Sequence, residues 1–180
     1  GLTGSDAQWL NAAYALVFAA LLVTVGRLGD LYGRRRLFLA GMLVFVASSV
    51  VAGSAVNPSM LIAARFVQGL GAGMIVPSTL STLNAVFTGR SRTIAFAVWG
   101  SAIGGMAAIG PLVGGWLATD LSWRWAFWLN IPVGLLVMIG IVRVVPETKD
   151  TSVVAGTDVP GVILSALGMG GIVFALIEGS

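Results

Sequence analysis

The chain contains six long apolar runs, separated by short segments that carry most of its charges. The runs cover residues 7–26, 37–56, 60–87, 94–118, 125–145 and 160–177. Each has roughly 18–28 residues, which lets a helix cross a bilayer but is too long for a barrel strand of about 10 residues. Because lipid offers the backbone no hydrogen-bond partners, each run is expected to be helical. We therefore predict an all-α fold, a polytopic transmembrane helical bundle with six spans.

The low charge content excludes an ordinary water-soluble domain. Only 9% of residues are charged and the mean hydropathy is +0.98, whereas soluble domains carry roughly 25% charged residues. The sequence has no cysteine and no histidine, so it lacks thiol chemistry, the commonest metal ligand and the usual general base. We expect no cofactor, no metal site and no nucleic-acid partner, because the basic residues mark loops.

The basic residues orient the chain in the membrane. The segments at the ends of the first, third and fifth runs contain Arg27, Arg34, Arg35, Arg36, Arg90, Arg92, Arg143 and Lys149. The segments on the opposite side contain only Arg124. The positive-inside rule therefore predicts cytoplasmic loops after spans one, three and five, in a cell membrane, with Gly1 and Ser180 outside. A protein that begins in the cytoplasm would need another helix before Gly1, so a longer natural chain is expected.

The first basic turn is a candidate gate. Its candidate gating residues are Gly26, Gly29, Asp30, Gly33, Arg34, Arg35 and Arg36. The glycines leave room for another helix end, and the carboxylate can pair with an arginine or accept from a helix N-terminus. Such contacts can form in one conformation and break in another. The alternative is an orientation signal with a solvated Asp30.

Arg65 is a charge inside the third apolar run. It lies about six residues into the run, roughly 9 Å from the helix end at 1.5 Å per residue. From this depth the side chain can snorkel to the headgroups. However, Gln68, Gly69 and Ala72 follow at helical spacing, and this small, polar face suits a protein-lined cavity better than lipid. We predict that Arg65 is functional and that Gln68 lines the cavity.

Two aromatic residues, Tyr14 and Trp99, are weaker candidates for substrate contact, since either can equally face lipid. Glycines recur four residues apart at 29/33, 69/73, 100/104 and 110/114, a spacing that lets membrane helices approach closely. Pro111 should bend its helix. Gly110, Gly114 and Gly115 flank it and allow tight contact with a neighbouring helix. The aromatic start of the fifth run is typical of an interfacial belt.

Two of these motifs resemble signatures of the major facilitator superfamily. The segment 26–36 resembles the loop between the second and third helices, where an aspartate and basic residues lock the cytoplasmic side. Leu31 departs from the pattern, because a basic residue is common there, whereas Arg34 matches. The spacing Arg65-x-x-Gln68-Gly69-x-Gly71 resembles the fourth-helix motif of proton-coupled facilitators, whose arginine biases an acidic partner. The resemblance implies that this partner lies upstream.

Two further motifs narrow the resemblance to the fourteen-helix drug:proton antiporters. The sequence Gly110-Pro111-x-x-Gly114-Gly115 resembles the fifth-helix signature of antiporters, with Met106 where a glycine is usual. The motif at 123–132 and the short linker resemble the fourteen-helix subgroup.

The resemblance implies a fragment that covers helices two to seven. Residues 1–145 would form an N-terminal transporter bundle lacking its first helix, 146–159 a cytoplasmic linker, and 160–180 an additional transmembrane helix. The implied function is a proton-coupled antiporter that exports drugs or other small amphipathic molecules, with the substrate, protons and lipid as partners. The alternatives are a dedicated exporter of one metabolite or antibiotic and, more remotely, a non-transporting truncated scaffold. An enzyme is not expected, because no nucleophile–base pair or metal cluster is visible.

Overall fold

The computed structural model describes residues 28–149, 164 and 168, and every regular element in that part of the chain is helical. The elements are α2 (Arg34–Gly53), α3 (Pro58–Val86), α4 (Gly89–Trp116), the π-helical turn η1 (Leu117–Leu121), α5 (Trp125–Trp128) and α6 (Asn130–Val144). Residues 28–32 are also helical. The predicted all-α fold is therefore confirmed. The spans expected at 7–26 and 160–177, together with Tyr14 and Gly26, lie outside the described residues.

Within residues 28–149, four segments are long and apolar enough to cross a membrane: Arg34–Gly53, Pro58–Val86, Gly89–Leu121 and Trp125–Val144. They correspond to the second to fifth apolar runs. Three of them begin earlier than the runs do, and two of these three begin within the basic turns, at Arg34 and Gly89. Arginine is a good helix former and can extend its charged head beyond the apolar layer, so the helix continues where the apolar pattern stops.

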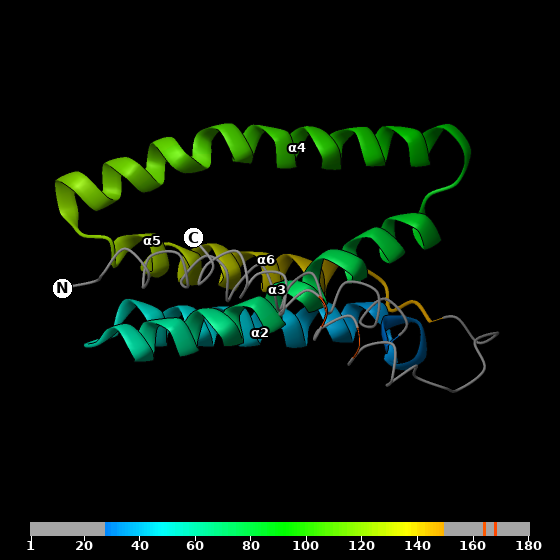
Figure 1. Ribbon diagram of the computed structural model, residues 1–180. Coiled ribbons are helices and arrows are strands. Elements are labelled where there is room, and N and C mark those ends of the chain that lie inside the picture. The colour runs from blue at the N-terminus through cyan, green and yellow to red at the C-terminus, as the bar shows by residue number, and fades with distance from the viewer. Residues whose placement is uncertain (1–27, 150–163, 165–167, 169–180) are drawn as a thin grey trace.

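The helices α2 and α3 form an antiparallel pair joined by a tight turn. Asn57 caps α3, because its side-chain oxygen accepts a hydrogen bond of 2.8 Å from the backbone N–H of Met60. Pro58 occupies the first helical position, where no N–H is needed. Farther along, Pro77 removes the backbone bond that would run to Gly73. The turns after Pro77 lead α3 away from α2 and toward the start of α4 (Figure 1).

The two helices touch through backbone at Gly41 and Gly71. A Cβ added at Gly71 would lie 2.7 Å from the carbonyl oxygen of Gly41, and one added at Gly41 would lie 2.8 Å from that of Gly71. Glycine is therefore required on both sides of this crossing. Spacing had singled out Gly69 and Gly73. Both residues are buried. The backbone contact with α2 is made by Gly71, which lies between them, and its partner Gly41 does not belong to any of the glycine pairs identified by spacing.

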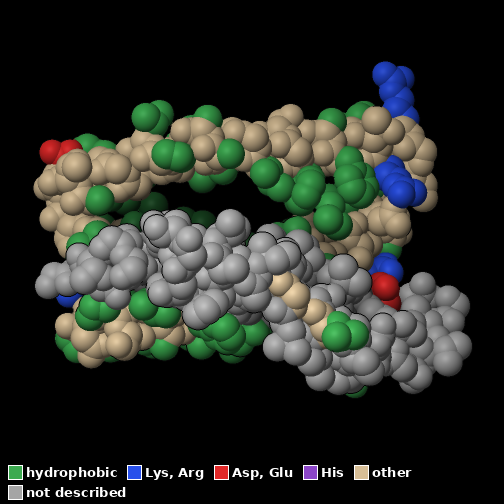
Figure 2. Space-filling view, in the orientation of Figure 1, with side chains coloured by type: hydrophobic (Ala, Val, Ile, Leu, Met, Phe, Trp, Pro, Cys, Tyr) green, Lys and Arg blue, Asp and Glu red, His purple; other side chains and the backbone are tan. Residues whose placement is uncertain are grey.

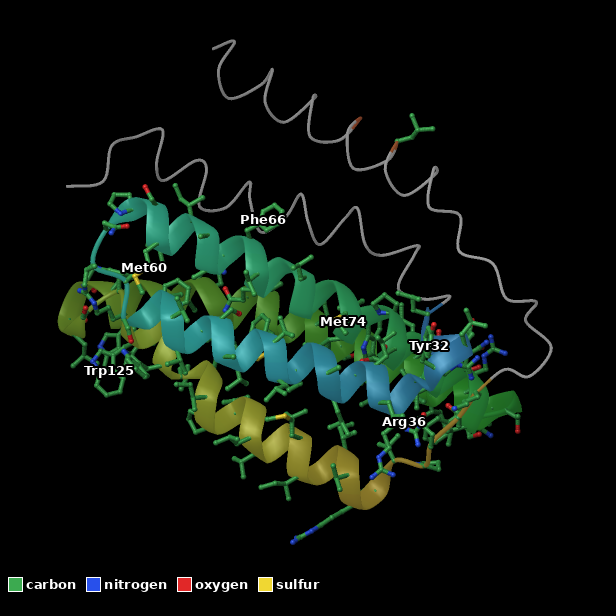
Figure 3. All side chains as sticks on the ribbon, turned by 90° about the horizontal axis from the view of Figure 1, so that it is seen from below. Tyr32, Arg36, Met60, Phe66, Met74 and Trp125 are labelled. Carbon is green, nitrogen blue, oxygen red and sulfur yellow. The ribbon has the colours of Figure 1, made fainter. Side chains whose placement is uncertain are left out.

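The helices α2, α3 and α6 lie together, whereas α4 runs alongside them at a distance (Figure 1). Tyr32 and Arg36 lie at one end of this group and Met60 and Trp125 at the other (Figure 3). We call the first the basic end, because most of the visible Lys and Arg side chains gather there (Figure 2). A hollow separates α4 from the other helices (Figure 2), and no residue of α4 is buried.

The crossing predicts that Gly71→Ala destabilises the protein while Gly100→Ala does not. The added methyl at position 71 overlaps backbone atoms, and such overpacking costs about 1–3 kcal/mol, whereas nothing lies within 4 Å of a Cβ at Gly100. The melting temperature in detergent measures both variants. Equal melting temperatures for the two would contradict the close backbone contact.

Candidate functional site

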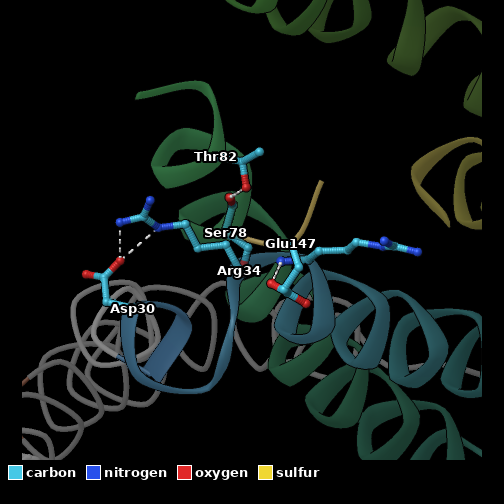
Figure 4. Close-up of polar contacts among 6 residues, drawn as sticks. Asp30, Arg34, Ser78, Thr82 and Glu147 are labelled. Atoms are coloured by element: carbon cyan, nitrogen blue, oxygen red, sulfur yellow. Dashed lines mark hydrogen bonds and ion pairs between the residues drawn. The ribbon is translucent and has the colours of Figure 1, made fainter. Parts of the chain in front are cut away.

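The Asp30–Arg34 pair forms the first part of the basic-end cluster. Both Nε and Nη2 of Arg34 donate to the same carboxylate oxygen of Asp30, at 2.9 and 2.7 Å (Figure 4). The side chains are 13% and 26% exposed for Arg34 and Asp30. Gly33 lies between the two residues, with φ 111°, and separates the helical turn at 28–32 from α2. The glycine break therefore sits inside the ion pair.

Glu147 completes this cluster from the segment that follows α6. Its two carboxylate oxygens accept hydrogen bonds from the backbone N–H groups of Arg35 and Arg36, at 3.1 and 3.2 Å. These N–H groups belong to the first turn of α2, which has no partner for them within the helix. Gly33 at the N-cap position supplies no side chain. A carboxylate also complements the positive end of the helix dipole.

Further contacts hold the same segment against α2. The backbone N–H of Arg34 donates to the carbonyl of Thr148 at 3.1 Å. The guanidinium of Arg35 donates to the carbonyl of Val142 at 2.8 Å, and that of Arg36 lies 3.7 Å from the Glu147 carboxylate. The end of α6 and the start of the linker are thus bound to the basic turn.

Gly33 is required by its backbone conformation, and it also lies close against the Glu147 carboxylate. Its φ of 111° lies in a region that side chains rarely allow, and a Cβ there would lie 2.6 Å from a carboxylate oxygen of Glu147. From the sequence, Gly33 is predicted to leave room for another helix end. Among the described residues, the Glu147 carboxylate lies against it. The signal available in the sequence was the first acidic residue after the fifth apolar run, on the side of the arginine cluster.

Arg65 belongs to a second polar cluster, between α2, α3 and α6. Its guanidinium donates to the amide oxygen of Gln68 at 2.7 Å, and the Gln68 amide nitrogen donates to the hydroxyl of Ser49 at 2.7 Å. The side-chain amide of Asn130 also donates to Ser49, at 3.2 Å. Gln68 and Ser49 are both fully buried. Gln68 was expected to line a cavity, whereas its amide lies inside the helix interface.

The aromatic segment before α6, residues 123–129, has some side chains packed against other helices and others exposed. Trp123 and Phe127 pack against the buried cluster formed by Ala52, Ala55, Leu61 and Ala64. The guanidinium of Arg124 donates to the carbonyl of Ala55 at 2.9 Å, just past the end of α2. Trp125 is half exposed, as an interfacial belt requires. The segment therefore anchors α5 to the α2–α3 turn.

The helix α4 contributes a pocket and an open glycine face. The pocket, of about 520 Å³, lies between α3 and α4 and is lined by Thr79, Leu83, Phe87, Ser91, Ile94, Ala95, Val98 and Trp99. The helix continues through Pro111. No described atom comes within 4 Å of a Cβ placed at Gly110, Gly114 or Gly115. Within the described residues, this motif contacts no neighbouring helix.

A sequence profile described as Major Facilitator Superfamily matches residues 1–178. The chain belongs to the Major Facilitator Superfamily. The predicted family is thereby confirmed, and with it a multi-pass membrane location. A solved structure of the peptide transporter POT has a similar fold, with a TM-score of 0.75 at 17% identity over 99% of this chain and 38% of that chain.

Curated proteins of this superfamily match most of the chain. The puromycin resistance protein pur8 of Streptomyces alboniger is 40% identical over 99% of this chain and 35% of its own length. The probable actinorhodin transporter of Streptomyces coelicolor is 41% identical over 96% and 30%, respectively. The multidrug transporter protein MdtP of Bacillus subtilis is 34% identical over 95% and 31%. The chain thus spans about a third of the length of these relatives.

The cap formed by Glu147 predicts a measurable protection of the start of α2. Removing the carboxylate in Glu147→Ala should expose the first amides of α2, because loss of a helix cap costs about 0.5–2 kcal/mol. Hydrogen exchange at the amides of Arg35 and Arg36 should then accelerate by roughly 2- to 30-fold. Lys149→Ala, a nearby exposed change, is the matched control. Exchange that is unchanged in Glu147→Ala would show that the cap does not protect α2.

Proposed function

We propose that the chain is the N-terminal part of a proton-coupled antiporter, which exports drugs or other small amphipathic molecules by alternating access. The superfamily and the resistance and multidrug names of the relatives support a transporter over an enzyme. The proposal of proton coupling rests on the position of Arg65. Its guanidinium is bonded to a fully buried amide, whereas a snorkelling arginine would place its charge among the headgroups. Placing a charge within a membrane span costs free energy, so a charged residue at such a position is expected to be functional.

The distribution of arginine supports a cytoplasmic location for the basic end. There, the Asp30–Arg34 pair and the Glu147 cap would close the cytoplasmic side. Gly26, Gly29 and Gly33 would give this turn its close approach to other elements. The exposed guanidinium of Arg36, at 72%, extends outward and is suited to an additional partner in the closed conformation.

The open glycine face of α4 supports a role in helix contact. Gly110, Gly114 and Gly115 would receive a helix from outside the described residues, with Pro111 shaping the approach. A tight contact there would prevent protons from leaking through the closed transporter. The absence of described neighbours around these glycines is consistent with a partner elsewhere in the full-length protein.

The apolar pocket beside Trp99 supports contact with an amphipathic substrate. Substrate pockets are mostly apolar, with a few polar groups that orient the ligand. Here the hydroxyls of Thr79 and Ser91 donate to backbone carbonyls, so they offer a ligand acceptor positions among apolar side chains. Tyr14 and Gln68 remain further candidates for substrate contact, although Gln68 would first have to leave its present hydrogen bonds.

A second candidate is a dedicated exporter of one antibiotic or metabolite. Its support is that the relatives at 40% and 41% identity are named for puromycin and actinorhodin. A resistance profile of an efflux-deficient host that expresses the full-length gene distinguishes the two candidates. Resistance to one chemical class favours the dedicated exporter, whereas resistance to several unrelated classes favours the multidrug antiporter.

The Arg65 assignment is tested in proteoliposomes that contain the full-length protein. Arg65→Ala should reduce drug-dependent proton flux on the order of tenfold or more, because hydrogen bonds to charged groups contribute about 1.5–3 kcal/mol. Arg65→Lys retains the charge and should lose less. Equal, near-normal flux in both variants would support the snorkelling alternative.

The pocket assignment is tested by comparing two tryptophans of α4. Trp99→Ala should raise the KM for apolar drugs several-fold, because it removes an aromatic wall of the pocket. Trp116→Ala is the matched control, since Trp116 is 58% exposed and does not line the pocket. Drug-dependent efflux measures both. The same KM in both variants would remove Trp99 from the substrate site.

A further inference from the structure

The aromatic segment before α6 reaches the Arg65 cluster through two side chains. The Phe127 ring centroid lies 5.9 Å from the guanidinium carbon of Arg65, within range of a cation–π contact, and Asn130 donates to Ser49. We propose that Asn130, Ser49 and Gln68 are positioning residues that hold Arg65 in one orientation for proton coupling. The proposal rests on the proton-coupled function above and extends it to the motif at 123–132, for which that function supplied no role.

The hydroxyl of Ser49 determines the direction of the hydrogen bonds. A serine hydroxyl has one donor and two acceptor positions. Ser49 donates to the carbonyl of Phe45 at 2.8 Å and accepts from both Gln68 and Asn130. All three positions are therefore used, at a residue with no exposed surface. Any missing partner would leave a buried polar group unsatisfied.

The amide of Gln68 can have only one orientation within this arrangement. Its neighbour on one side, the Arg65 guanidinium, has donors and no acceptor. Its neighbour on the other side is the hydroxyl of Ser49, which already donates its one hydrogen bond to the carbonyl of Phe45. Gln68 must therefore present its oxygen to Arg65 and its nitrogen to Ser49, as observed. Asn130 stabilises this direction, because it occupies the remaining acceptor position of Ser49.

The junction between α5 and α6 brings Phe127 and Asn130 to the same side. They are three residues apart on either side of Leu129, a helical spacing that places side chains on one face. The segment is itself anchored to the α2–α3 turn by the bond from Arg124 to Ala55. The position of this segment and the orientation of Arg65 are thus linked by direct contacts.

Ser48 provides a matched control within the same turn of α2. Its hydroxyl also donates to the carbonyl of Phe45, at 2.9 Å, and the residue is 4% exposed. Gln68 and Asn130 donate to Ser49. Ser48→Ala and Ser49→Ala therefore remove equivalent bonds to the same carbonyl, and only Ser49→Ala removes the acceptor for the two amides.

The test uses the full-length protein in proteoliposomes and measures two activities. One is drug-dependent proton flux, and the other is drug counterflow without a proton gradient. Ser49→Ala and Asn130→Leu should lower proton flux by roughly tenfold, the factor expected for a buried hydrogen bond to a charged network. Counterflow should change by less than about twofold, Ser48→Ala should resemble the wild type, and Ser49→Thr, which retains a hydroxyl, should recover proton flux. Equal effects of Ser48→Ala and Ser49→Ala, or equal loss of both activities, would overturn the proposal.

Melting temperatures in detergent give a second test that does not depend on transport. Asn130→Leu and Gln68→Leu should be strongly non-additive, because both act through Ser49, while Ser48→Ala with Gln68→Leu should be additive. Additivity of the first pair would overturn the positioning role. If the wild-type protein carries no drug-dependent proton flux, the proposed function fails, and non-additivity of the first pair would still support the positioning of Arg65.

Discussion

The crossing of α2 and α3 at Gly41 and Gly71 is the contact on which the described bundle depends. Because each backbone lies against the other, side chains farther along the two helices come within hydrogen-bonding distance. Ser49 on α2 and Gln68 on α3 can meet directly only at such short separation. A pair of helices held apart by larger side chains would leave both polar groups buried without partners, which a membrane interior strongly disfavours.

The first residue of α6 and the segment after α6 both supply polar partners to α2. Glu147, after α6, satisfies the first amides of α2, while Asn130, at the start of α6, satisfies a hydroxyl within it. One end of this arrangement carries charge and partly exposed side chains. The other contains the Arg65 guanidinium beside two fully buried polar residues, Ser49 and Gln68. Opposite ends of one helix pair thus use different chemistry for the same purpose, the satisfaction of polar groups that lipid cannot satisfy.

The features that the sequence predicted well are those set by local pattern. Apolar run length predicted the all-α fold and the family motifs predicted the superfamily, because both depend on residues close together in the chain. The partners Glu147, Ser49 and Asn130 were missed, since hydrogen bonds such as Asn130 to Ser49 join residues about eighty positions apart. Periodicity carries no information about such pairs. The glycine spacing describes one helix face, whereas the contact at Gly71 is determined by what lies opposite it on α2.

The attachment of α2 at several points along α6 restricts how these helices can move. Glu147 holds the start of α2, Gly134 lies directly against Val46 near its middle, and Asn130 bonds to Ser49 beyond that. A slide of α6 along α2 by one helical turn, about 5.4 Å, would break all three attachments together. A rotation of the two helices as one body would break none. The α2–α6 pair is therefore suited to move as one rigid body, with bending and shear confined to other elements.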